Sequence, residues 1–408
     1  MNTKVIAIIA SLVGLTAQAQ TGSSPLSSGI DRILTEECTS GRLPGAVVMV
    51  SLDGKIIHHA AYGKARQFDD QWKMLPTAEA MTTSHLFDIA SLTKVTATTT
   101  ALLVLANRGA IAIDDQVNKY LPSFSGPSKD SVTLRHLLTH TGGLIEWYPM
   151  YYRSNNRRST VDLICSLPLA WPVGKVRKYS DLGFTLLGAI IEQVSGKPLE
   201  TFTEEEVFLP LGMKDTYFLP NTKAAHPPIA ATSFGNPYEY RMVHDPSLGF
   251  QRPEIDPDSW DGWRLYTLSG EVNDGNTWYA GQGISGAAGL FSTAADLMRL
   301  TSMWMNRGGH RGKPFVSATT VDQFITQDRF RNGLGWMMDP SSSFMKDAPS
   351  GSFGHTGFTG TSIVAVPSKK LVVILLTNRQ HRGLLPDKIY YNVGPVRQQV
   401  FEAVMKAI

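Results

Sequence analysis

The chain has 408 residues, of which 42% are hydrophobic and 18% charged, so it can bury a large core and is neither disordered nor collagen-like. Its formal net charge of +3 comes without a cluster of Lys and Arg on one face or in a tail. This balance argues against a nucleic-acid partner and against a polyanionic substrate.

The N-terminus has the pattern of a secretory signal. An apolar run extends from Val5 to about Ala17, and an Ala-x-Ala cleavage site ends at Ala19. The run is shorter than the roughly 20 apolar residues of a membrane span. We therefore predict a signal peptide over residues 1–19 and a mature chain over 20–408 that is secreted or periplasmic, with no stable membrane insertion.

Two hairpins and several helices are predicted in chain order. Two β-rich runs surround an Asp-Gly turn between Gly45 and Gly63. Apolar spacing and glycine stops predict helices over 92–107, 133–139, 183–194 and 294–306, the last opened by a capping box of Thr293 and Asp296. A second hairpin is predicted from Thr361–Val366 and Leu371–Thr377.

Strands near both ends of the chain and helices between them predict one antiparallel sheet flanked by helices, an α/β fold. We expect a single domain whose α/β part covers about 20–82 and 285–408 and whose helical and loop part covers about 83–284. The stretch from about 220 to 286 is rich in Pro, Gly and aromatic residues and is expected to form long loops that line the site.

The first chemical element is Ser91-x-x-Lys94 at the start of the 92–107 helix. Positions three apart share a helix face, so the Ser91 hydroxyl and the Lys94 amine can meet, and a buried amine with a lowered pKa can take the serine proton. A second copy, Ser343-x-x-Lys346, lies in a segment predicted to be a loop with no helix to fix the pair, and is interpreted as a chance match.

The second element is Tyr179-Ser-Asp181, which directly precedes a helical pattern. A phenol held near a Ser/Lys pair can shuttle protons to a leaving group. Tyr390-Tyr-Asn392 is a competing match that follows the C-terminal hairpin, and we interpret it as structural.

The third element is His355-Thr356-Gly357, just before a strand-like run, where a glycine lets a ligand backbone approach the strand edge. A competing match, His140-Thr-Gly142, closes a predicted helix and is interpreted as a helix stop and turn.

The order of these motifs resembles that of class C β-lactamases, DD-carboxypeptidases and related esterases, and is most similar to weak periplasmic penicillin-binding carboxypeptidases. The resemblance extends over nearly the whole mature chain. It implies that Ser91 is the nucleophile, Lys94 its base partner and Tyr179 the acid/base, and that the N–H groups of Ser91 and Phe358 form the oxyanion hole. It also implies that His355 and Thr356 contact the carboxylate or leaving group of the substrate.

The chain departs from the family pattern near the substrate. Asp181 replaces the usual Asn, so an amide donor becomes an acceptor-only carboxylate. His355 replaces the usual Lys, which makes a positive charge depend on pH. Asn273 and Ala287 stand where relatives often have His. These departures argue against efficient antibiotic hydrolysis.

We therefore expect a serine hydrolase that cleaves amide bonds of D-amino-acid-containing, peptidoglycan-like substrates through an acyl-enzyme. A small-ester hydrolase, a weak β-lactamase and a penicillin-binding sensor without turnover are the alternatives. The expected partner is a small molecule or a peptidoglycan peptide, with no cofactor and, since His-Glu-x-x-His spacing is absent, no metal. Cys38 and Cys165 permit one disulfide, but two free buried thiols are favoured.

Overall fold

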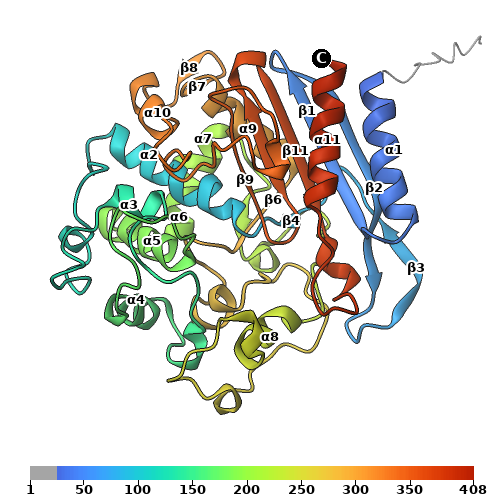
Figure 1. The fold of residues 1–408 in the computed structure, drawn as a ribbon. Coiled ribbons are helices and arrows are strands. Elements are labelled where there is room, and N and C mark those ends of the chain that lie inside the picture. The colour runs from blue at the N-terminus through green and yellow to red at the C-terminus, as the bar shows by residue number, and fades with distance from the viewer. Residues whose placement is uncertain (1–24) are drawn as a thin grey trace, which may run out of the picture.

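Six strands from both ends of the chain form one antiparallel sheet in the order β3-β2-β1-β11-β10-β9 (Figure 1). The structure, a computed structural model, describes residues 25–408, so the predicted signal peptide over 1–19 lies outside the described residues. The strands are β1 (Gly45–Leu52), β2 (Lys55–Phe68), β3 (Met74–Ala80), β9 (Phe353–Thr356), β10 (Ser362–Val366) and β11 (Leu371–Thr377).

Both predicted hairpins are confirmed. β1 and β2 surround Asp53-Gly54, while β10 and β11 flank a short turn that begins at Pro367. The N-terminal and C-terminal hairpins join along β1 and β11, where Ala46 lies opposite Thr377. The predicted α/β fold, with one sheet built from both ends of the chain, is therefore confirmed.

Two terminal helices, which the sequence analysis missed, cover one face of this sheet: α1 (Pro25–Thr39) and α11 (Gly394–Ala407) (Figure 1). Their apolar residues pack in one cluster with the side chains of β1, β10 and β11 that point to this face. The spacing of Ile30 and Leu34, and of Val400 and Val404, is the period of a helix face and could have revealed both helices.

The opposite face of the sheet is covered by α9 (Ala294–Met305), which contacts β1, β10 and β11. The other helices are α2 (Thr100–Asn107), α3 (Leu134–Leu138), α4 (Arg157–Ser166), α5 (Asp181–Ser195), α6 (Leu199–Thr203), α7 (Leu209–Leu211), α8 (Pro237–His244) and α10 (Ala318–Phe324). The four predicted helices are confirmed, with α2 preceded by a π-helical stretch over Lys94–Thr99. The stretch expected to be loops contains α8 and a π-helical turn, Asn276–Ala280.

Only half of the predicted capping box forms at α9. The Thr293 hydroxyl accepts the N–H of Asp296 at 3.2 Å. The Asp296 carboxylate does not bond back to the N-cap, because it accepts the N–H of Asp215 at 2.7 Å and the hydroxyl of Thr216 at 3.0 Å. A contact distant in sequence thus replaces the local one.

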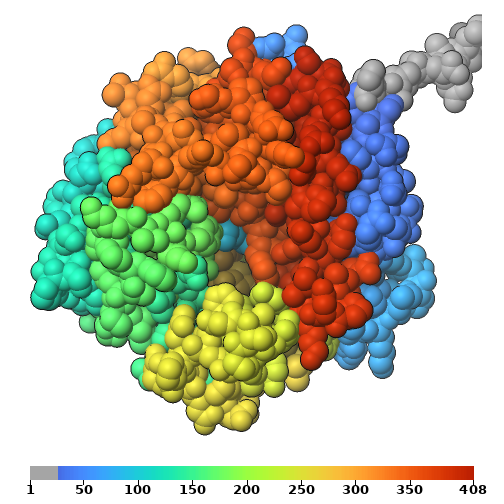
Figure 2. All heavy atoms as spheres, in the orientation of Figure 1, coloured from blue at the N-terminus to red at the C-terminus, as the bar shows by residue number. Residues whose placement is uncertain are grey.

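A small three-stranded sheet contains the strand that precedes Ser91. Its strands are β4 (Phe87–Asp88), β6 (Leu290–Ser292) and β5 (Tyr217–Phe218), in the order β4-β6-β5; a separate pair is β7 (Gly309–His310) with β8 (Lys313–Pro314). β4 ends just before Ser91. The molecular surface is hollowed where the helical region, the segment around α8 and the C-terminal part meet (Figure 2).

The sequence analysis also predicted no stable membrane insertion and favoured two free thiols. Among residues 25–408, no helix is both long and apolar enough to span a bilayer. Cys38 and Cys165 are both free thiols, as favoured, although Cys38 is only partly buried.

Candidate active site

Ser91 lies in a strained turn between β4 and the helix that starts at Leu92. Ala90 has a φ of 45°, a left-handed conformation that is costly for a residue with a side chain. The Asp88 carboxylate holds the turn by accepting the N–H of Ala90 at 2.8 Å and that of Asn273 at 2.7 Å. Such a turn fixes the direction of the Ser91 hydroxyl before any substrate binds.

Lys94 is fully buried beside Ser91, at the first residue of the π-helical stretch. Its ammonium donates to Ser91 Oγ at 3.0 Å and to the carbonyl of Ala287 at 2.8 Å, and lies 2.7 Å from Asp181 Oδ1. The Ser91–Lys94 pair expected from the helix spacing is therefore in contact.

The charges around Lys94 keep it protonated. Burial alone would lower the pKa of Lys94, but the Asp181 carboxylate and then the Tyr179 phenol outweigh burial, so that the pKa is raised above its ordinary value. Lys94 is thus a hydrogen-bond donor to Ser91 in the resting site. Burial alone favours the lowered pKa that a general base needs, and the Asp181 carboxylate reverses that direction.

Tyr179 lies just before α5 and faces both members of the pair. Lys94 Nζ is 5.1 Å from the centre of the Tyr179 ring. Burial raises the pKa of Tyr179, while the Lys94 charge and hydrogen bonding to Ser91 oppose this rise. Ser91, Lys94 and Tyr179 therefore meet at one point, and their titrations are linked.

His140, which the sequence analysis had interpreted as part of a helix stop, also braces Tyr179. The two rings stack with centroids 4.3 Å apart, and His140 Nδ1 accepts the N–H of Ser180 at 3.1 Å. Its φ of 57° fits the predicted turn after α3. The motif is thus both a helix stop and a support for the candidate acid/base.

His355 lies on edge strand β9, with only 2% of its surface exposed. Its Nδ1 lies 2.8 Å from the carbonyl of Thr356, which makes Nδ1 the protonated nitrogen. Burial, assisted by the Lys94 charge, lowers the pKa of His355 to about 3. The expected pH-dependent positive charge is therefore absent near neutral pH, and His355 stays neutral.

Gly357 is required by the packing of β9 against the Ser91 turn. A Cβ at this position would lie 2.2 Å from Thr361 Oγ1 and 2.4 Å from the carbonyl of Ile89. The glycine therefore has a structural reason beyond the expected approach of a ligand.

The N–H groups of Ser91 and Phe358 donate no hydrogen bond within the described residues. The Phe358 carbonyl, in contrast, accepts two hydrogen bonds from the Arg379 guanidinium, at 2.9 Å and 2.6 Å, which fixes this peptide. Two free backbone donors beside a nucleophile are what an oxyanion hole needs.

A pocket of about 310 Å³ opens on Ser91 and is bounded by residues from the helical region, the α8 segment and the C-terminal part. Tyr179, Asp181 and Phe358 line it, whereas His355, Thr356 and Gly357 do not. Tyr390, which the sequence analysis interpreted as structural, also lines it. Its ring lies 5.9 Å from that of Phe358.

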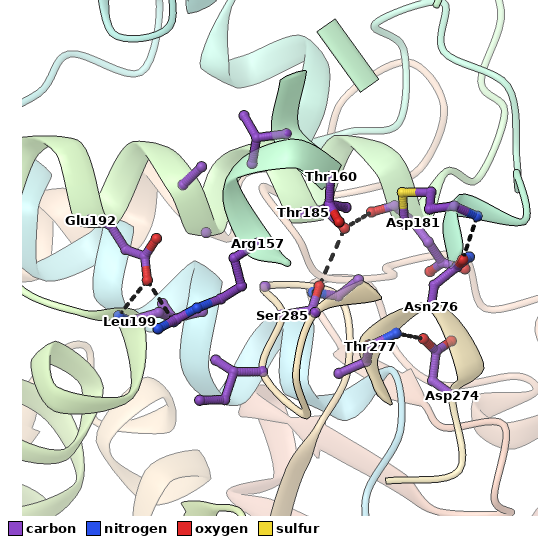
Figure 3. A pocket seen from close by; sticks show the side chains of 18 residues that line it. Arg157, Thr160, Asp181, Thr185, Glu192, Leu199, Asp274, Asn276, Thr277 and Ser285 are labelled. Carbon is purple, nitrogen blue, oxygen red and sulfur yellow. Dashed lines mark hydrogen bonds and ion pairs between the residues drawn. The ribbon is translucent and has the colours of Figure 1, made fainter. Parts of the chain in front are cut away.

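A narrower cavity of about 30 Å³ lies behind Asp181, enough for one or two water molecules (Figure 3). Asp181 and Asp274 line both this cavity and the pocket on Ser91. Arg157 and Glu192 form an ion pair at its other end. Asp181 thus stands between the ammonium of Lys94 and both cavities.

Asn273 and Ala287, the two positions where relatives often have His, contribute backbone atoms to the site. The Ala287 carbonyl binds Lys94, and the Asn273 N–H binds Asp88. No group of three or more His, Cys, Asp or Glu that could hold a metal occurs in the described part of the chain.

The comparisons with known proteins agree with this geometry. The family model described as Beta-lactamase matches residues 30–393, so the chain belongs to the Beta-lactamase family of serine hydrolases. It is 34% identical to "N-acetylmuramyl-L-alanine amidase" of Bacillus subtilis (strain 168), covering 89% of this chain and 83% of that protein. It is 31% identical to "Putative D-alanyl-D-alanine carboxypeptidase" of Escherichia coli (strain K12), covering 92% and 89%.

The fold is also similar to a solved structure described as a novel penicillin-binding protein homolog from Caulobacter crescentus. The two chains are 20% identical and superpose with a TM-score of 0.69 over 95% of this chain and 98% of the other. This likeness shows the fold that the motif order predicts.

Replacing Asp181 by Asn should change substrate preference. The variant removes the carboxylate that raises the pKa of Lys94 and supplies an amide donor for an acylamino carbonyl. The change at Lys94 affects every substrate, so it cancels in a ratio of two acylation rates. We expect the benzylpenicillin rate to rise relative to that of a p-nitrophenyl ester by about 10-fold, the value of one regained hydrogen bond.

Stopped-flow acylation with both substrates measures this ratio. A ratio that stays constant or falls would mean that Asp181 serves Lys94 alone and does not face the acyl side chain.

Proposed function

We propose that the protein is a serine hydrolase that forms an acyl-enzyme at Ser91 and cleaves amide bonds in peptidoglycan-like substrates containing D-amino acids, in the manner of a DD-carboxypeptidase. The observation that carries the proposal is the contact of Ser91 Oγ with Lys94 Nζ, at 3.0 Å, on the wall of a substrate-sized pocket. The names of the relatives support an amide bond of the cell wall as the target.

In this mechanism Lys94 passes a proton to the Asp181 carboxylate, and the neutral amine takes the proton of Ser91 Oγ as that oxygen attacks the carbonyl carbon. The N–H groups of Ser91 and Phe358 stabilise the oxyanion. Tyr179 then gives its phenolic proton to the leaving nitrogen and regains one from Lys94, and a water molecule releases the acyl group by the reverse path. The contact of His355 and Thr356 with the leaving group remains an expectation of the family resemblance, since neither residue lines the pocket on Ser91. No step requires a metal or a cofactor.

A second candidate is the amide that joins a muramic acid to L-alanine, because the relative from B. subtilis carries that name. Hydrolysis of small esters needs the same three residues, and weak β-lactamase activity is disfavoured by Asp181. A penicillin-binding sensor would be acylated at Ser91 but would not turn over. We further propose that the mature chain begins after Ala19 and acts outside the cytoplasm on a small molecule or a wall peptide.

Digestion of a purified disaccharide pentapeptide separates these activities. Loss of a single D-alanine, followed by mass spectrometry, is the expected result. Release of the intact peptide from the sugar would identify the muramyl amidase instead. The disaccharide tetrapeptide, which lacks the terminal D-alanine, is the matched control and should remain intact. Product limited to one equivalent per protein, or no product from either compound, would overturn the proposal of a turning-over hydrolase.

A further inference from the structure

The pocket on Ser91 is lined by acidic side chains and by no basic ones among the described residues. Three carboxyl groups line it, those of Asp181, Glu239 and Asp274, and no Lys, Arg or His among the described residues does. Asp181 is balanced by Lys94 at 2.7 Å. Glu239 and Asp274 have no ion-pair partner in residues 25–408.

Glu239 places its carboxyl in the pocket wall. One oxygen, Oε2, accepts the N–H of Gly275 at 2.8 Å. The carboxyl also interacts with the hydroxyl of Tyr151, which lies beside it. Part of the side chain remains open to the pocket.

The surroundings of these carboxyls favour a cation. Burial raises the pKa of Glu239 to about 8, and the Asp274 charge adds to the rise. Burial and then the Asp181 charge raise the pKa of Asp274. Arg264 opposes the rise at Glu239, but its guanidinium is engaged with the carbonyls of Val272 and Asn273. A cation placed between the carboxyls would relieve their repulsion.

Aromatic rings complete the wall. Trp147 packs edge-on against Phe250, with centroids 5.8 Å apart, and Tyr238 lies 5.6 Å from Phe358. All four residues line the same pocket. Rings beside carboxylates are the usual surroundings of a bound ammonium group.

We propose that Glu239 and Asp274, with the aromatic wall, form a subsite for a cationic group on the acyl part of the substrate, such as a primary ammonium of a wall peptide. The inference rests on the proposed acyl-enzyme function and names which acyl groups it accepts. It excludes a free carboxylate from this side of the pocket.

Two isosteric esters test the subsite. p-Nitrophenyl 4-(trimethylammonio)butyrate carries a permanent charge, and p-nitrophenyl 5,5-dimethylhexanoate places a carbon where the first has nitrogen. The ratio of kcat/KM, charged over neutral, should exceed one. Glu239→Gln should reduce it by about 10-fold, the loss of one charge-assisted contact. Asp261→Asn is the matched control. Asp261 is an exposed acid in the same stretch from about 220 to 286, and its replacement should leave the ratio unchanged.

The pH dependence gives a second readout. The charge of the substrate is constant, so the ratio should rise from pH 6 to pH 9 as Glu239 ionises around its pKa of about 8, and should stay flat in Glu239→Gln. Asp274, Tyr151 and Arg264 face Glu239 and are unchanged in this variant.

The thermal stability of Glu239→Gln tests whether this variant is folded. Unfolded Glu239 ionises from its ordinary pKa of 4.5, whereas the folded group ionises only around 8, so the wild type loses stability as pH rises between these values. The Tm of Glu239→Gln should therefore exceed that of the wild type by a margin that grows over this window.

The two proposals fail differently. If neither ester acylates Ser91, the proposed function is wrong. If both esters acylate Ser91 but Glu239→Gln leaves the ratio and its pH dependence unchanged, the cationic subsite is wrong and the proposed function stands.

Discussion

Ser91→Ala is expected to abolish covalent labelling by a fluorophosphonate or a penicillin probe, because the hydroxyl is the atom that forms the bond. The change removes one oxygen from a half-buried side chain, so the fold is retained. Hydrolysis should fall by on the order of 10⁴-fold or more. Intact-protein mass spectrometry measures the adduct directly, and a Tm equal to that of the wild type shows that the loss is chemical.

Ser343→Ala is the matched control within the same chain. Ser343 and Lys346 repeat the Ser-x-x-Lys pattern, and Ser343 begins a single 3₁₀ turn, Ser343–Met345, instead of the predicted loop. No hydrogen bond between Ser343 and Lys346 occurs in the described structure, and Lys346 is exposed. Labelling of Ser343→Ala should equal that of the wild type. An adduct on Ser91→Ala as large as that on the wild type would remove Ser91 from the mechanism.

The sequence predicted the features that depend on residues close together in the chain. Ser91 and Lys94 lie three residues apart in one helix, and both hairpins are bounded by turn residues. The helices α1 and α11 were not predicted, although the regular spacing of their apolar residues is an equally local signal.

Contacts between distant segments could not be predicted. The carbonyl of Ala287 binds Lys94, and the N–H of Asn273 binds Asp88, but backbone atoms leave no trace in the residue types. The stack of His140 on Tyr179 depends on how α3 packs against α5. The same dependence hid the place of Tyr390 in the pocket, because its motif is no different from a structural one.

The short distance between Asp181 and Lys94 determines the protonation state of Lys94, and this state affects the expected chemistry more than any other contact. Sequence alone left open whether a buried Lys94 is a neutral base, as burial favours, or an ammonium. The 2.7 Å ion pair decides for the ammonium. Proton transfer from Ser91 therefore needs a rearrangement of charge among Lys94, Asp181 and Tyr179, and no single residue can be assigned as the base in isolation.

Lys94→Met and Tyr179→Phe should each reduce kcat by about 10³-fold or more, and the double variant should lose far less than the product of the two. The reason is that both residues handle the same proton, so that once either is absent the other has little left to do. Tyr179→Phe keeps the ring stacked on His140, while Lys94→Met leaves Asp181 unpaired, so a Lys94→Met/Asp181→Asn variant removes that added cost.

Single-turnover kinetics on a p-nitrophenyl ester measure the double-mutant cycle of Lys94 and Tyr179. In the wild type, the pH profile of kcat/KM should report apparent values that belong to the pair, and each single variant should shift both limbs. Losses that simply multiply would assign Lys94 and Tyr179 to separate steps, and would leave Lys94 only the task of orienting the Ser91 hydroxyl through the 3.0 Å hydrogen bond.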